Sequence, residues 1–125
     1  MYNLFLDDYR NPKTSFFLSN KQLYVDLDWV IVRNYDDFVS YITKNGLPDL
    51  CSFDHDLADS HYNNDVDINY DDYQEKTGYH CAKWLIDYCI DNKLKPPNYL
   101  VHSMNPAGAD NIVGIIESYK RFLKI

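Results

Sequence analysis

Three clusters of polar side chains in this sequence have the residue types needed for metal binding and proton transfer. Each cluster directly follows a short apolar segment. The clusters are Asp7, Asp8 and Arg10; Asp54, His55 and Asp56; and His102, Ser103 and Asn105. Carboxylates bind cations, and imidazoles accept or donate a proton near neutral pH. We therefore expect a binding or catalytic site wherever the fold brings these clusters together.

Four of these side chains are carboxylates, and four carboxylates close together cannot all stay ionised without a cation. A divalent ion such as Mg²⁺ or Mn²⁺ would stabilise them, because hard cations prefer oxygen ligands. We therefore predict that Asp7, Asp8, Asp54 and Asp56 bind such a metal. Two alternatives stay open at this point: the imidazoles could recruit a transition metal, or the aspartates could simply cap helices that follow the strands.

Short apolar segments predict the strands, and periodic patterns with capping residues predict the helices. The predicted strands are residues 3–6, 29–32, 50–53 and 99–101. The predicted helices run from Asn34 or Tyr35 to Gly46, from Thr77 to about Asp91, and from Asp110 or Asn111 onwards. Residues 16–18 are predicted as a short strand or a packed loop.

Strands that alternate with helices at this spacing favour a single α/β domain over residues 1–125. We expect about four to five parallel strands with helices on both faces. In a parallel sheet all carboxyl ends of the strands lie at one edge, where open α/β folds bind ligands. The three polar clusters should therefore meet in one crevice.

The composition excludes several classes of protein. The chain has 125 residues and a formal net charge of -7, which argues against binding duplex DNA through a basic face. No apolar run approaches the roughly 20 residues of a membrane span, and two aspartates occur too early for a signal peptide. Cys51, Cys81 and Cys89 form no CxxC pair, so we expect buried free thiols and a cytoplasmic location.

An acidic segment at about residues 57–76 lacks a hydrophobic period, and we predict an inserted loop. It begins like a calcium-binding loop, but Tyr70 occupies the position of the required glycine and Lys76 that of the last ligand. These two residues exclude an EF-hand. The loop could be solvated, or it could cover the crevice with His61 or Tyr62 near a substrate. In either case its negative charge favours a small, metal-assisted phosphate ligand.

The order of these motifs resembles the cyclic-phosphate processing receiver domain family, a divergent relative of response-regulator receivers. The matching segments are residues 4–12 (LFLDDYRNP), 52–57 (SFDHDL), 77–79 (TGY) and 102–108 (HSMNPAG), with a strand led by Trp29 between the first two. The resemblance spans nearly the whole chain and implies a receiver-like or flavodoxin-like sheet. It also implies action on a cyclic phosphate of a nucleotide or of an RNA end.

Our leading hypothesis for the activity of this chain is a metal-dependent phosphoesterase. The aspartates named above would hold Mg²⁺ or Mn²⁺. His55 or His102 would act as general acid or base, and Asp56 would orient a histidine or complete the metal shell. In a variant of this mechanism, Asp54 is a covalent nucleophile, as in receivers.

Phosphate oxygens would be bound by Ser103, Asn105, Arg10 and backbone amides around Gly108. Ala109 follows Gly108 where the family usually has a basic residue, and the chain lacks the lysine of a receiver's fifth strand. These departures favour an alternative, a catalytically inactive receiver-like module that binds or sequesters a nucleotide signal or a partner protein. An ordinary phospho-signalling receiver is a weaker third hypothesis, because it needs that lysine.

Overall fold

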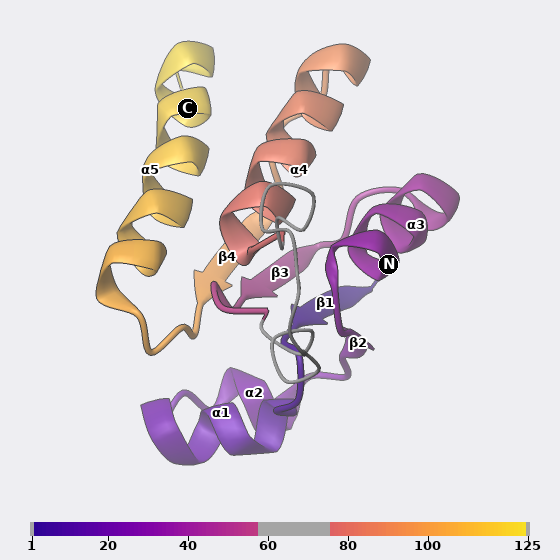
Figure 1. Ribbon diagram of the computed structural model, residues 1–125. Helices are drawn as coiled ribbons and strands as arrows, with labels where there is room; N and C mark the ends of the chain where they lie inside the picture. Colours follow the sequence, from indigo (N-terminus) through magenta and orange to yellow (C-terminus); the bar gives the residue numbers. More distant parts are fainter. Residues whose placement is uncertain (1, 58–75, 125) are drawn as a thin grey trace, which may run out of the picture.

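The computed structural model describes residues 2–57 and 76–124, and the predicted acidic loop at about residues 57–76 lies almost entirely outside them. One sheet is formed by β1 (Asn3–Leu6), β2 (Val30–Val32), β3 (Leu50–Phe53) and β4 (Asn98–Val101) (Figure 1). The strand order is β2-β1-β3-β4, and every neighbouring pair is parallel. The predicted α/β fold with a parallel sheet is confirmed, with four strands in the described residues.

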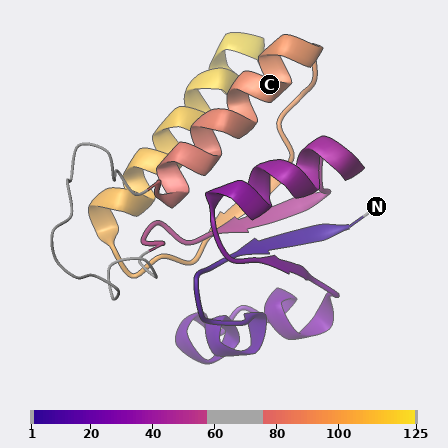
Figure 2. The ribbon, with the colours of Figure 1, turned by 45° about the vertical axis from the view of Figure 1, so that its right-hand side comes forward.

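Helices cover both faces of the sheet, as predicted. They are α1 (Pro12–Ser19), α2 (Leu23–Asp26), α3 (Tyr35–Asn45), α4 (Gly78–Asn92) and α5 (Pro106–Leu123). The short helices α1 and α2 lie on one face, and α3, α4 and α5 lie side by side on the other (Figures 1 and 2). None of these helices combines the length and the apolar character that a membrane crossing requires.

The ends of α3 and α4 form where the sequence predicts them. The Asn34 side chain accepts a hydrogen bond from the Asp37 amide, and Gly46 follows α3 with a φ of +87°, a conformation that favours glycine. Thr77 caps α4, and His80 Nδ1 accepts a hydrogen bond from the Thr77 amide at 2.9 Å. These local hydrogen bonds set the first turn of each helix.

The prediction of a strand or loop at residues 16–18 is wrong, because these residues lie in α1. Asn11 caps this helix with its side chain, and Pro12 occupies the first helical position. Proline is favoured there because its missing N–H has no helical partner to lose. Phe17 and Leu18 are exposed, so this helix lacks the apolar periodicity by which the others are recognised.

The predicted start of the last helix is also wrong. Helix α5 begins at Pro106, about one turn before Asp110 or Asn111. The Asn105 side chain accepts the Gly108 amide at 2.9 Å and so caps the helix earlier,. This difference places Gly108 in the first turn of α5, at the edge of the sheet where the polar clusters meet.

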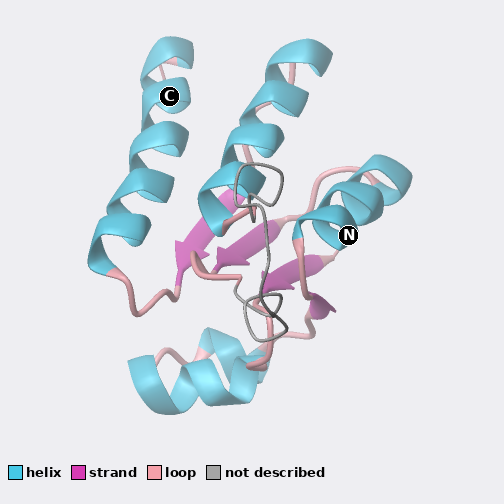
Figure 3. Cartoon of the chain, in the orientation of Figure 1, coloured by secondary structure: helices cyan, strands magenta, loops and turns pink. Residues whose placement is uncertain are grey.

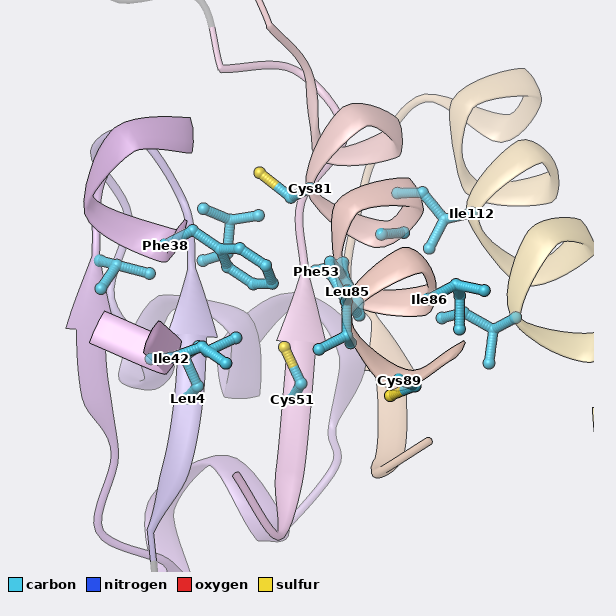
Figure 4. Packing of buried hydrophobic residues seen from close by; sticks show 14 of the residues in the cluster. Leu4, Phe38, Ile42, Cys51, Phe53, Cys81, Leu85, Ile86, Cys89 and Ile112 are labelled. Carbon is cyan, nitrogen blue, oxygen red and sulfur yellow. The ribbon is translucent and has the colours of Figure 1, made fainter. Parts of the chain in front are cut away.

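The main core lies between the sheet and helices α3, α4 and α5 (Figure 4), and Figure 3 shows the same layers coloured by secondary structure. Leu4 of β1 and Cys51 of β3 pair on this face. Phe5 and Ser52, one residue later in each strand, point to the opposite face, toward α2,. All three cysteines are free and buried, as predicted.

Candidate functional site

Backbone hydrogen bonds extend the sheet by one residue at three strand ends. The Asp7 amide donates to a β2 carbonyl at 3.1 Å, the Asp54 amide to a β1 carbonyl at 3.0 Å, and the His102 amide to a β3 carbonyl at 2.9 Å. Each of these residues therefore lies directly after its strand and continues the hydrogen bonding to the adjacent strand. The sheet therefore places one residue of each predicted cluster side by side, at the carboxyl ends of three adjacent strands.

Asp7, Asp54 and His102 form a buried cluster that could hold a metal ion. One carboxylate oxygen of each aspartate and one imidazole nitrogen lie within 4.8 Å of one another. Asp7 is 0% exposed, Asp54 is 7% exposed, and the His102 side chain is 2% exposed. Two oxygens and one nitrogen can serve either a hard cation or a transition metal, so the donor set alone does not select the ion.

The Asp7 carboxylate accepts three hydrogen bonds. Its Oδ1 accepts the amides of Tyr9 at 3.0 Å and of Arg10 at 2.8 Å, and its Oδ2 lies 3.0 Å from His102 Nε2. Burial alone would raise the pKa of Asp7, but the hydrogen bonds from His102 and from the two amides outweigh burial and lower it,. An ionised carboxylate has about four acceptor positions, so roughly one is left for a cation.

Asp54 is in the opposite situation. Within the described residues, no hydrogen bond to its carboxylate is present. Burial, followed by the charges of Asp7, Asp8 and Asp56, raises the pKa of Asp54 to about 7, and the charge of Arg10 opposes this. A buried carboxylate without a donor, beside other carboxylates, is stabilised by a bound cation. The residues therefore fit a metal ion at this position.

The His102 ring has contacts at both of its nitrogens and on one of its faces. Its Nδ1 lies 2.7 Å from Ser52 Oγ, which in turn lies 2.8 Å from the Tyr24 hydroxyl. The Phe5 ring stacks on the imidazole with the centroids 4.4 Å apart and an angle of 5° between the planes. Neither Tyr24 nor Ser52 was predicted from the sequence as part of the site. A signal was present for Ser52, because it is a polar residue two positions before Asp54 in an otherwise apolar strand.

His55, Asp56 and the first turn of α5 make a second group beside this cluster. His55 Nδ1 lies 2.9 Å from Asp56 Oδ1. The same oxygen also accepts a hydrogen bond from the side-chain Nδ2 of Asn105 at 3.3 Å. The His55 side chain is 16% exposed. The hydrogen bond from His55 is the main cause of a lowered pKa at Asp56. A Cβ atom on Gly108 would lie 2.2 Å from His55 Cγ, so only glycine lets α5 approach the ring this closely.

A family model for the cyclic-phosphate processing receiver domain matches residues 2–118. The chain belongs to the cyclic-phosphate processing receiver domain family. The matched residues include the whole sheet and both polar groups described above. The resemblance and the receiver-like fold predicted from the sequence are therefore confirmed. Comparison with curated proteins finds no match.

In this family member, the residues predicted to bind phosphate make different kinds of contact. Ser103 Oγ accepts a hydrogen bond from the backbone amide of Asn105 at 3.0 Å. The side-chain oxygen of Asn105 caps α5 by accepting the backbone amide of Gly108. The Arg10 guanidinium lies over the Tyr9 ring, 5.3 Å from its centroid, and acts on Asp54 by its charge. Asn105 and Gly108 therefore hold the His55 group together, whereas the charge of Arg10 lowers the pKa of Asp54.

Two further residues position the site of this receiver domain. Arg33, directly after β2, donates through Nη1 to the carbonyl oxygen of Asp7 at 3.2 Å and also to that of Arg10. The Gly78 amide at the start of α4 donates to the His55 carbonyl at 2.7 Å. A Cβ atom on Gly78 would lie 1.8 Å from the Asp54 carbonyl oxygen. The hydrogen bonds of Arg33 and the close approach of Gly78 fix the backbone around the site aspartates.

Proposed function

We propose that this receiver domain is a metal-dependent phosphoesterase that hydrolyses a cyclic phosphate of a nucleotide or of an RNA end. The observation that carries the proposal is the buried Asp54 carboxylate, which has no hydrogen-bond donor in the described residues and adjoins the ionised Asp7. Membership of the cyclic-phosphate processing family supports the choice of substrate.

Asp7 and Asp54 would bind the cation directly, and Asp8 and Asp56 would add negative charge around it. The ion would be Mg²⁺ or Mn²⁺, which neutralises the charge of a phosphate and lowers the pKa of a bound water. Asp7 keeps about one acceptor position open, and Asp54 keeps both oxygens open toward its surroundings in the described residues. These two carboxylates thus support a cation held from two adjoining strands.

His55 is the histidine to which we assign proton transfer. Asp56 engages its Nδ1, which leaves Nε2 to exchange a proton, and the side chain is more exposed than that of His102. As a general base His55 would take a proton from the attacking water, and as a general acid it would return one to the leaving oxygen. Such proton transfer contributes roughly 10²–10⁴-fold in rate. His102, with both ring nitrogens engaged, would hold Asp7 in place.

The reaction would add a water oxygen to phosphorus and break one of the two ester bonds of the ring. Arg10 would contact the phosphate oxygens, because its positive charge lowers the pKa of Asp54 and its guanidinium forms no ion pair in the described residues. The Ser103 hydroxyl uses its oxygen as an acceptor and keeps its own proton to donate,. Asn105 and Gly108 would act indirectly, by holding Asp56 and His55.

A binding module without turnover is the second candidate function. It is favoured by Ala109, which supplies no cation after Gly108, and by the Gly108 amide, whose hydrogen bond is taken by Asn105. Such a module would bind a cyclic nucleotide through the same cation and release it unchanged.

Turnover assays separate the two functions. Cyclic mononucleotides, cyclic dinucleotides and RNA with a 2′,3′-cyclic phosphate end would be tested with Mg²⁺ and with Mn²⁺. We expect ring opening of one substrate class, reduced at least 100-fold in His55→Ala and in Asp54→Asn. Asp87→Asn, an exposed carboxylate on α4, is the matched control and should keep full activity. Stoichiometric binding without turnover would overturn the enzyme in favour of the module.

A further inference from the structure

Four buried polar side chains form one continuous hydrogen-bonded chain from α2 to the proposed cation position. The Tyr24 hydroxyl lies 2.8 Å from Ser52 Oγ, which lies 2.7 Å from His102 Nδ1, and His102 Nε2 lies 3.0 Å from Asp7 Oδ2. All four side chains are at most 3% exposed. This buried chain joins α2, β3 and the residues that follow β4 and β1.

The phenol of Tyr24 sets the direction of every hydrogen bond in this buried chain. At the Asp7 end, Oδ1 already accepts two backbone amides, and Oδ2 lies 3.0 Å from His102 Nε2. At the other end, burial raises the pKa of Tyr24, so the phenol keeps its proton. Ser52 is its hydrogen-bond partner in the described residues, so Tyr24 donates to Ser52. The Ser52 hydroxyl then donates to His102 Nδ1, so the imidazole carries its proton on Nε2 and donates it to Asp7 Oδ2,.

A single arrangement of the imidazole satisfies both ends of the hydrogen-bonded chain, with a proton on Nε2 and none on Nδ1. A ring protonated at Nδ1 would have to donate to Ser52, and Ser52 would donate to Tyr24. The phenolic proton would then lose its acceptor in a buried position, which is unfavourable. Stacking on Phe5 and the edge contact with Tyr24 also prevent the ring from turning.

We propose that Tyr24 and Ser52 are positioning residues that hold the proton of His102 on Nε2 and thereby aim the Asp7 carboxylate at the cation. This inference rests on the proposed function. It also deepens it, because a protonated Nε2 cannot bind a metal and Nδ1 is taken by Ser52. His102 is then excluded from the metal shell. The ligands that remain are carboxylate oxygens, and such a site suits Mg²⁺ or Mn²⁺ better than metals that prefer nitrogen or sulfur ligands.

The first test is nitrogen-15 NMR of the histidine rings, because it distinguishes rings protonated at Nε2, at Nδ1 or at both. We expect His102 to carry its proton on Nε2 in the wild type, both without metal and with Mg²⁺. In Tyr24→Phe and Ser52→Ala this preference should weaken, and Ser52→Thr should restore it by returning the hydroxyl. A wild-type ring protonated at Nδ1 or at both nitrogens would overturn the inference, as would loss of the Nε2 proton on addition of Mg²⁺.

The second test is the affinity for Mn²⁺, measured by calorimetry without substrate. Loss of a group that orients a metal ligand weakens metal binding by roughly 10–100-fold, and we expect this in both variants. Tyr41→Phe and Ser15→Ala are matched controls, because neither hydroxyl forms a hydrogen bond in the described residues. Wild-type affinity in Tyr24→Phe and Ser52→Ala would contradict the inference alone. A wild type that binds neither Mn²⁺ nor Mg²⁺ would instead contradict the proposed function.

Discussion

Asp7 and Asp54 are neighbouring carboxylates with opposite surroundings. Three hydrogen bonds lower the pKa of Asp7 against the effect of its burial, whereas Asp54 has no such donor in the described residues. Burial and the nearby aspartates raise the pKa of Asp54 to about 7. Neighbouring titratable groups whose pKa values are driven apart in this way are typical of functional sites. A cation at this position would compete with the proton on Asp54.

Asp54 should make the metal-free protein less stable as the pH rises. Its folded pKa is raised, so its stabilising contribution is complete below the unfolded pKa of about 4 and is lost as the pH rises through about 7,. Asp54→Asn should remove this dependence and be more stable than the wild type at pH 8, by at most about 4 kcal/mol. The measurement is urea unfolding at pH 5 and pH 8 in a chelator.

Asp87→Asn provides the control for this prediction, because it removes an exposed carboxylate that pairs with Lys83 on the surface of α4. Its pH dependence should match that of the wild type. If Asp54→Asn loses stability between pH 5 and pH 8 to the same extent as the wild type, the raised pKa does not govern this range.

The N-terminal ends of helices α4 and α5 pack against the residues that follow β3. Each approach requires a glycine: Gly78 lies against the Asp54 backbone, and Gly108 lies against the His55 ring. The Gly78 contact is with backbone, which cannot move aside. The Gly108 contact is with a side chain, which can. Substitution at Gly108 should therefore displace His55 and leave the fold intact.

Gly108→Ala should lower kcat by about tenfold or more and leave Mn²⁺ affinity within about twofold of the wild type. The added methyl group would push the His55 ring away from Asp56, and proton transfer depends steeply on such geometry. The matched control is Gly114→Ala in the same helix, where a Cβ atom would meet nothing within 4 Å. This control should keep full activity and gain roughly 0.5–1 kcal/mol of stability. Equal activity of the two variants would argue against His55.

The charge of the whole molecule is unevenly distributed. The formal net charge is -7, and residues 54–75 contain eight acidic residues and no lysine or arginine. The remaining chain is nearly neutral, with 11 acidic and 12 basic residues, obtained as 19 minus 8 and 12 minus 0. This excess adjoins the site aspartates in sequence, so bound cations should stabilise the entire fold.

Mn²⁺ at about 100 times its Kd should stabilise the folded protein by about 2.7 kcal/mol, because only the folded state holds the carboxylates together. For a chain of this size, the midpoint of thermal unfolding should rise by several degrees. Asp54→Asn should abolish this rise, which calorimetry with and without a chelator would measure. An equal rise in Asp54→Asn would place the cation elsewhere on the protein.

The strands, two of the helix starts and the family of this protein could be predicted from local sequence. Apolar segments of four residues or fewer identified all four strands of the described residues, and Asn34 and Thr77 marked the starts of α3 and α4, because caps and periodicity act within one turn,. The polar residues after three strands were predicted to meet, since the carboxyl ends of parallel strands lie at one edge, and Asp7, Asp54 and His102 do lie together there. The motifs also predicted the family, which the match over residues 2–118 confirms.

The tertiary structure decided what each polar residue contacts. Tyr24, Ser52, His102 and Asp7 are joined across separations of 28, 50 and 95 residues, and no local pattern encodes such hydrogen bonds. They follow from the pairing of the strands, which turns His102 toward Asp7 and places His55 against α5. The sequence thus determined which side chains gather at the sheet edge. Packing decided which of the two histidines is buried, because only the assembled layers set the burial of a side chain.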